Sequence, residues 1–153
     1  MKMKIAVPVD ANNKMYHSNA WTAPAFAIYL ITEKDEMIVF ECIDHKKNPW
    51  LEIDERVVCD PAMHADGCSD AVKADPTHLA EHSIILKALN DCSYLIVETF
   101  CSNVKKVLEN GGIEIFQLPP IVKEPDLAIK NLLVNLDFAT LQNIRKAKER
   151  PAL

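Results

Sequence analysis

Glycine is scarce in this chain of 153 residues, which contains only Gly67, Gly111 and Gly112. Loops that wrap nucleotide phosphates need several closely spaced glycines, because their backbone amides must approach the phosphate oxygens. No stretch of the sequence offers such a run. A glycine-rich phosphate-binding loop is therefore excluded.

Positive charge is also in deficit, since 17 lysines and arginines are outnumbered by 22 aspartates and glutamates, for a net charge of -5. Nucleic-acid binding requires a basic surface that neutralises phosphates. The charge balance therefore argues against nucleic acid as a partner.

Long hydrophobic runs are missing as well. The apolar run Ile5 to Val9 is interrupted by Pro8 and followed by Asp10, so it is too short for a signal-peptide core or a membrane span. Five cysteines without an export signal suggest the reducing cytoplasm, where thiols stay available for metal or redox chemistry. We expect a cytoplasmic protein that does not associate with a membrane.

What the chain does contain is a concentration of sulfur and imidazole. The segment 59–82 holds two of the five cysteines and three of the five histidines, and it shows almost no apolar periodicity. Thiolate and neutral imidazole are the donors that soft and borderline metals prefer. The candidate metal ligands are Cys59, His64, Cys68, His78 and His82.

The spacing of these residues supports metal binding without identifying a known motif. Cys59, His64 and Cys68 follow the pattern C-x4-H-x3-C, which matches no standard zinc-finger spacing. His78 and His82 are four residues apart on an expected helix, so both face one side and suit a single ion. The alternatives are two buried thiols beside a surface histidine, and a helical histidine pair that is exposed or makes structural hydrogen bonds.

The remaining cysteines lie in or beside the expected strands. Cys101 follows a strand and precedes a helix, whose N-terminus lowers the pKa of a thiol, so this position favours a reactive cysteine or a ligand. A buried thiol beneath the helix is the alternative. Cys42, in an apolar strand run, and Cys92, ahead of a buried strand, are interpreted as structural.

Hydrophobic patterning predicts the element order β-β-β-α-β-α-β-α. The expected strands cover 4–9, 26–32, 37–43, 94–97 and 113–118. The expected helices cover 76–89, the segment from Cys101 to Gly111 and, after the last strand, the consecutive segments 126–136 and 138–148. The early strands form an antiparallel hairpin, and the later β-α-β crossover requires parallel pairing. We predict a three-layer α/β domain over 1–153 with a mixed five-stranded sheet and helices on both faces, in which 3–136 form the core and 138–148 a C-terminal helix.

Ligands of such sheets bind beyond the carboxyl ends of the strands. The loop after Val9 and the turn at 99–103 both lie at such ends. The segment 59–82 could reach them, which predicts a binding site at this rim.

Several separated pieces of the chain resemble the dinitrogenase iron–molybdenum cofactor biosynthesis family. These pieces are Met3 to Val9, Ala23 to Tyr29, Asn48-Pro49, Tyr94 to Val97, and Val107-Leu108 through Gly111-Gly112-Ile113-Glu114-Ile115. They are spread over most of the segment 3–136. The resemblance implies a ribonuclease-H-like fold and a role, related to nitrogen fixation, as a carrier or store of iron–molybdenum or molybdenum–copper clusters.

The chain departs from this family at the expected cluster contacts. The family has Ser-x-His-Phe-Gly-Arg ahead of Ala-Pro, and here the corresponding run is His17-Ser18-Asn19-Ala20-Trp21-Thr22. Asn19 takes the place of the family's histidine, and His17 lies two residues away. Where the family has a glycine-rich turn after the fourth strand, this chain has Phe100-Cys101-Ser102. The cofactor-binding residues that the resemblance implies are therefore His17, Asn19 and Cys101.

Together these features predict a metal- or metallocluster-binding carrier or assembly protein that is not an enzyme. The expected cargo is a cluster of the iron–molybdenum, molybdenum–copper or iron–sulfur type, with a zinc ion as the alternative. The expected partner is a protein that donates or accepts the cluster, and the chain could also form a homo-oligomer. The alternative functions are a thiol-based redox sensor or enzyme centred on Cys101 and an interaction domain with a structural zinc.

Overall fold

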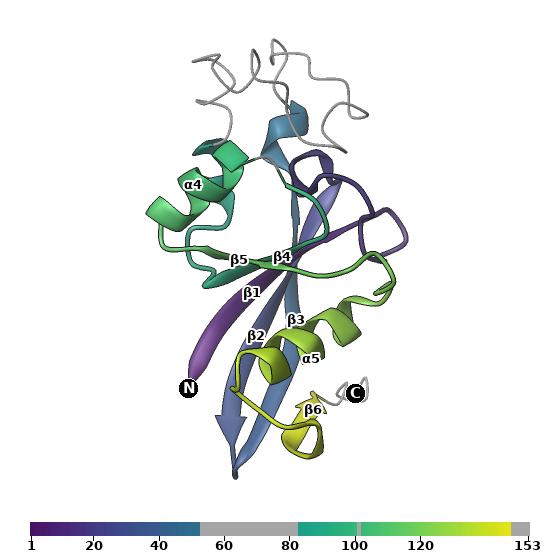
Figure 1. Cartoon of the computed structure of the whole chain (residues 1–153), viewed down its shortest axis with the longest axis vertical. Coiled ribbons are helices and arrows are strands. Elements are labelled where there is room, and N and C mark those ends of the chain that lie inside the picture. The colour runs from purple at the N-terminus through teal and green to yellow at the C-terminus, as the bar shows by residue number, and fades with distance from the viewer. Residues whose placement is uncertain (53–82, 101, 148–153) are drawn as a thin grey trace, which may run out of the picture.

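The structure is a computed structural model that describes residues 1–52, 83–100 and 102–147 (Figure 1). Within these residues the chain forms an α/β fold with one mixed six-stranded sheet. The strands are β1 (Lys2–Val9), β2 (Ala25–Lys34), β3 (Met37–Lys47), β4 (Tyr94–Val97), β5 (Glu114–Gln117) and β6 (Ile144–Lys146). Residues 83–88 are helical, and two further helices are α4 (Ser102–Asn110) and α5 (Pro125–Asn135). Short 3-10 helices are η1 (Ala20–Thr22), η2 (Pro49–Glu52) and η3 (Leu141–Asn143).

The strand order in the sheet is β5-β4-β1-β2-β3-β6. The pairs β1–β2 and β2–β3 are antiparallel, whereas β1–β4, β4–β5 and β3–β6 are parallel. Asp35 and Glu36 join the long β2–β3 hairpin, with φ of 51° and 62°. Positive φ at both central residues is the requirement of a type I′ turn, whose twist matches that of the strands. The predicted hairpin is therefore present.

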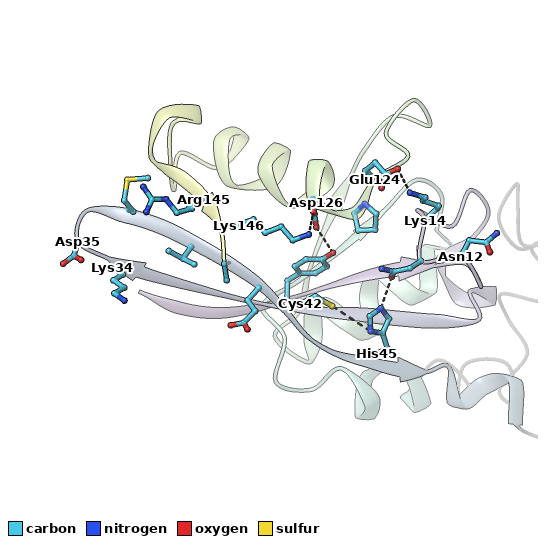
Figure 2. Close-up of a pocket in the computed structure, with 17 residues that line it drawn as sticks. Asn12, Lys14, Lys34, Asp35, Cys42, His45, Glu124, Asp126, Arg145 and Lys146 are labelled. Atoms are coloured by element: carbon cyan, nitrogen blue, oxygen red, sulfur yellow. Dashed lines mark hydrogen bonds and ion pairs between the residues drawn. The ribbon is translucent and has the colours of Figure 1, made fainter. Parts of the chain in front are cut away.

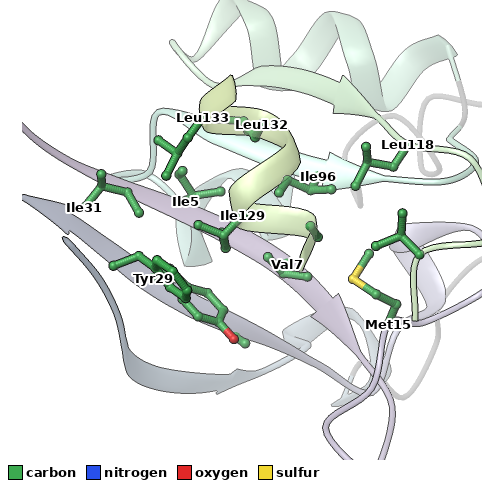
Figure 3. Packing of buried hydrophobic residues seen from close by; sticks show 14 of the residues in the cluster. Ile5, Val7, Met15, Tyr29, Ile31, Ile96, Leu118, Ile129, Leu132 and Leu133 are labelled. Carbon is green, nitrogen blue, oxygen red and sulfur yellow. The ribbon is translucent and has the colours of Figure 1, made fainter. Parts of the chain in front are cut away.

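Alternation along β1 distributes the core between the two faces of the sheet. Ile5 and Val7 belong to a cluster that contains Ile129 and Leu132 of α5, and Figure 3 shows this cluster closely packed. Ala6 belongs to a second cluster on the other face. That cluster contains Ile85, Leu89, Leu108, Trp21 and Trp50. Helices therefore cover both faces, with α5 on one side and α4 and residues 83–88 on the other.

The end of α4 lies where the two adjacent glycines predict it. Gly112 has a φ of +88°, and the backbone N–H of Ile113 donates to the carbonyl of Leu108 at 2.9 Å. Glycine reaches this left-handed conformation without steric cost, which is why it closes helices.

No helix in the described parts of the chain is long and apolar enough to cross a lipid bilayer.

The prediction of five strands and of a helix over 138–148 was wrong. Asp137, with a φ of 57°, ends the helical segment, and η3 is followed by β6, which pairs in parallel with β3 from Ile38 to Phe40. The 11-residue strand β3 has an edge whose backbone groups need partners. Pairing with that edge, and packing of Ile144 against the core, outweigh the helical propensity of the basic segment.

Candidate functional site

The carboxyl ends of β1 and β4 lie side by side, because these strands pair in parallel. The chain returns to this rim after the loop that follows β1, where Asn19 forms a parallel bridge with Thr99. The backbone N–H of Ala20 donates to the carbonyl of Thr99 at 3.3 Å. The loop 10–19 and the residues that follow β4 therefore form one structural unit, which we call the rim site and which contains His17, Asn19, Glu98 and Thr99.

His17 and Glu98 make the shortest polar contact in the rim site. Nδ1 of His17 lies 2.6 Å from Oε1 of Glu98. The Glu98 side chain is only 4% exposed, whereas the His17 side chain is 45% exposed. A carboxylate only accepts hydrogen bonds, so Nδ1 carries the proton and donates it. This leaves Nε2 as a lone-pair donor on a ring that solvent reaches.

Asn19 is fully buried in the same unit. Its Oδ1 accepts the backbone N–H of Trp21 at 3.0 Å and so caps η1. Its Nδ2 and the Oγ1 of Thr99 are both buried, and neither makes a hydrogen bond with any described residue. Buried polar groups without a partner cost about 1–3 kcal/mol each, so two of them together at one rim are unusual.

Aromatic packing and side-chain hydrogen bonds hold the rest of the loop. Tyr16 Oη lies 2.6 Å from Oγ1 of Thr22, and Asn48 Nδ2 donates to the carbonyl of Trp21 at 2.7 Å. The rings of Trp21 and Trp50 pack at a centroid distance of 5.8 Å, and both are buried. These aromatic residues belong to the core, and they fix the backbone that carries His17 and Asn19.

The predicted site residues divide into two groups. The structure brings His17 and Asn19 together at the predicted rim, next to the turn that follows β4. The others lie outside the described residues: Cys59, His64, Cys68, His78, His82 and Cys101. Their convergence on the rim site stays a prediction. Within the described ranges, no three His, Cys, Asp or Glu side chains are grouped so that they could hold a metal ion.

Glu98 and Thr99 are the members of the rim site that sequence reasoning missed. Both follow directly after the apolar strand Tyr94–Val97, at the end of a strand where ligands of α/β sheets bind. A carboxylate placed immediately after an apolar strand was the available signal. What the sequence could not supply is the contact with His17, which lies 81 residues earlier in the chain.

Comparison with known proteins adds no relative. No family model matches the chain, and no curated protein matches it.

Proposed function

We propose that this protein is a metal or metallocluster carrier that holds its cargo at the rim site through His17. The single observation that carries the proposal is the contact between His17 Nδ1 and the buried carboxylate of Glu98 at 2.6 Å. Histidines that bind metals almost always donate their other ring N–H to a carboxylate, a carbonyl or water, which fixes the tautomer and raises the basicity of the ligating nitrogen. His17 has this arrangement, with Nε2 on the exposed side.

The chemistry of the neighbouring groups suits a cluster. Imidazole is a ligand for iron, copper and zinc. The buried Nδ2 of Asn19 is a hydrogen-bond donor without a partner among the described residues, and the buried hydroxyl of Thr99 also has no partner among them. Hydrogen bonds to the sulfur atoms of a cluster tune its potential, so these two groups fit an inorganic sulfide cargo.

The cysteines and histidines of the segment 59–82, together with Cys101, are proposed to complete the donor set. Cys101 follows Thr99 by two residues in the sequence. The proposed cargo is a cluster of the iron–molybdenum, molybdenum–copper or iron–sulfur type, and zinc is the alternative. A partner protein in the cytoplasm would supply or accept it. Open coordination positions favour transfer, whereas a closed tetrahedral set favours a structural zinc.

The proposed family is that of the dinitrogenase iron–molybdenum cofactor biosynthesis proteins, with a three-layer, ribonuclease-H-like fold. The strand order β5-β4-β1-β2-β3, antiparallel in β1–β2–β3 and parallel in β1–β4–β5, supports this proposal. β6 is then an addition at the β3 edge. The alternatives of a redox centre at Cys101 and of a structural zinc depend on residues outside the described ranges, and no described contact favours them.

Metal content of the protein purified without oxygen tests this function. Elemental analysis and the visible absorption spectrum are expected to show stoichiometric metal in the natural chain and a loss of most of it in His17→Ala. Ser18→Ala is the matched control, because it changes the neighbouring residue of the same loop and should keep the metal. A natural chain without stoichiometric metal, or equal metal in His17→Ala and Ser18→Ala, would overturn the proposal.

A further inference from the structure

An open groove of about 1150 Å³ lies on the α5 face of the sheet (Figure 2), and its lining does not include His17, Asn19, Glu98 or Thr99. Its walls come from β3, from the start of α5, from the loop 12–14 and from residues 145–147. Cys42, His45 and Asn13 line it, and Asn13 belongs to the loop 10–19 that also carries His17. The sequence favours a structural role for Cys42, and the structure adds that this residue lines the groove.

A β-bulge brings the thiol and the imidazole to the same face of β3. The register between β2 and β3 shifts between Ile28 and Tyr29, because Ile43 is an extra residue on β3. Side chains alternate along a regular strand, so residues three apart point to opposite faces. The extra residue shifts this alternation by one, and Cys42 and His45 therefore both face α5.

The three side chains form a chain of polar contacts. Nδ1 of His45 lies 4.0 Å from Sγ of Cys42, and Nε2 of His45 lies 2.8 Å from Oδ1 of Asn13. The amide oxygen accepts the Nε2–H, so Nδ1 is the basic nitrogen and faces the sulfur. A nucleophile, a base within reach and a third group that orients the base are the requirements of nucleophilic catalysis by a cysteine, a histidine and an asparagine.

The orienting residue is itself held firmly. Asn13 has a φ of 59°, and its backbone N–H donates to the carbonyl of Asp10 at 3.0 Å. Oδ1 of Asp10 accepts the backbone N–H groups of Asn12 at 2.8 Å and Lys14 at 3.0 Å. Asparagine tolerates this left-handed conformation better than most residues. The loop therefore fixes the backbone that carries the Asn13 amide.

The surroundings of Cys42 keep its proton on the sulfur until a base removes it. Burial is the main cause that raises the pKa of the Cys42 thiol, and the Asp126 carboxylate contributes to the rise. The hydrogen bond with the Asp44 backbone, in which Sγ lies 3.6 Å from the carbonyl, and the charge of Lys146 oppose this rise without cancelling it. Asp126 itself accepts the hydroxyl of Tyr29 at 3.1 Å and the ammonium of Lys146 at 2.7 Å. Attack by this sulfur therefore needs a proton acceptor, and His45 is the one within reach.

We propose that the groove is a second functional site, in which Cys42 is a nucleophile assisted by His45 and reacts with small zwitterionic peptide disulfides. In this step the Cys42 proton passes to Nδ1 of His45, and the sulfur bonds to one sulfur of the disulfide as the original S–S bond breaks. The departing thiolate takes the proton from His45 and leaves as a thiol. The product is a mixed disulfide on Cys42, and the small disulfide is the oxidant.

The charges along the groove fit such a ligand. Lys14 pairs with Glu124 at 2.6 Å on one wall, and Lys146 pairs with Asp126 at 2.7 Å on another. Paired charges of both signs suit a molecule that carries ammonium and carboxylate groups together. Disulfide exchange also needs no cradle of donors for an oxyanion, because the negative charge stays on sulfur throughout.

Reaction of the full, reduced, metal-free chain with oxidised glutathione tests the proposal. Peptide-level mass spectrometry follows the mixed disulfide at Cys42 and, in the same sample, at the buried Cys92. Cys42 is expected to react faster than Cys92, and His45→Gln is expected to lower the Cys42 rate constant about 10- to 100-fold. Equal rate constants in the natural chain and His45→Gln, or no mixed disulfide at Cys42, would overturn the proposal.

Asn13 is tested separately as a positioning residue. Asn13→Ala should lower the Cys42 rate constant about threefold to tenfold, because the imidazole loses its orientation. Asn13→Asp keeps an oxygen acceptor for Nε2–H and should restore the rate. Asn13→Gly accepts the left-handed backbone but has no side-chain oxygen, so it should stay as slow as Asn13→Ala, which a merely structural role would not predict. Asn12→Ala is the matched control in the same loop, and a decrease as large as that in Asn13→Ala would contradict the role of Asn13. These rates are measured without metal, so they do not depend on the proposed carrier function.

Discussion

At the scale of single residues, the polar groups that matter are those that burial leaves with few partners. Glu98 is a buried carboxylate, and its side chain lies 2.6 Å from Nδ1 of His17. The side-chain oxygen of Asn19 caps η1, whereas its buried amide nitrogen makes no hydrogen bond with any described residue. Both features have a cost that a bound ligand would offset.

Replacement of the carboxylate at position 98 tests whether it supports a metal ligand. Glu98→Gln is expected to weaken metal binding about 10- to 100-fold, because the neutral amide no longer raises the basicity of the His17 ring. Competition with a metal-binding dye under anaerobic conditions measures the affinity. An unchanged affinity, with His17→Ala still defective, would show that His17 binds without help from Glu98.

The buried Cys92 thiol makes the free energy of unfolding depend on pH in the alkaline range. Burial raises the pKa of this thiol from 9.0 to about 11, so the folded state holds its proton after the unfolded chain has released it. The contribution is therefore fully present below about pH 9 and is lost as the pH rises towards 11, by up to about 3 kcal/mol. Denaturant unfolding between pH 8 and pH 11 measures the loss.

Cys92→Ala is the reference for this pH dependence, because it removes the titrating group and leaves the other groups in place. The stability advantage of the natural chain over Cys92→Ala is expected to shrink as the pH rises from 9 to 11. Two stability curves that stay parallel over this range would rule out the thiol as the cause.

At the scale of elements, the ends of helices and the edges of the sheet decide the structure. α4 closes at Gly112, whose φ of +88° is strained for any residue with a Cβ atom. β6 forms because the edge of β3 offers unpaired backbone groups. The β-bulge at Ile43 changes which side chains of β3 share a face. Each of these features depends on a single residue or on a single pairing.

Substitution of Gly112 tests the first of them. Gly112→Ala is expected to lower the free energy of unfolding by about 1–2 kcal/mol, because an alanine must adopt the left-handed conformation. Lys106→Ala, at an exposed position of the same helix, is the control and should change stability by less than about 0.5 kcal/mol. Equal stabilities of the two variants in chemical denaturation would contradict the conformational explanation.

At the scale of the whole molecule, two candidate sites are built from different contacts of the same sheet. The rim site lies beyond the carboxyl ends of β1 and β4, and the groove lies between β3 and α5. The loop 10–19 contributes to both, through His17 at the rim site and Asn13 at the groove. Their proposed chemistries need different partners, and the tests above separate them.

The proposed role of the cysteines in the segment 59–82 concerns the whole molecule, because it requires distant parts of the chain to converge on the rim site. Cys59→Ser and Cys68→Ser combined are expected to abolish bound metal if these thiolates complete the donor set with His17. Elemental analysis after anaerobic purification measures the result. Unchanged metal content in the double variant would end the assignment of both ligands.

Sequence reasoning succeeded where local chemistry decides the outcome. The strand Tyr94–Val97, the hairpin turn at 33–36 and the closure of α4 at its glycines were predicted and are present. It failed over 138–147, where a basic amphipathic pattern predicts a helix but pairing with β3 forms β6. The bulge that turns His45 towards the Cys42 thiol leaves no local signal in the sequence, so their contact could not be predicted.

The sequence by itself determined where β1 to β5, α4 and α5 run, and that His17 and Asn19 lie in a loop beyond the first strand. Alternation of apolar residues and the conformational freedom of glycine are local properties, so they can be read along the chain. Only the tertiary structure decided that His17 meets Glu98 and that Cys42 meets His45 and Asn13. These contacts depend on strand register and parallel pairing, in which a shift of one residue moves a side chain to the opposite face.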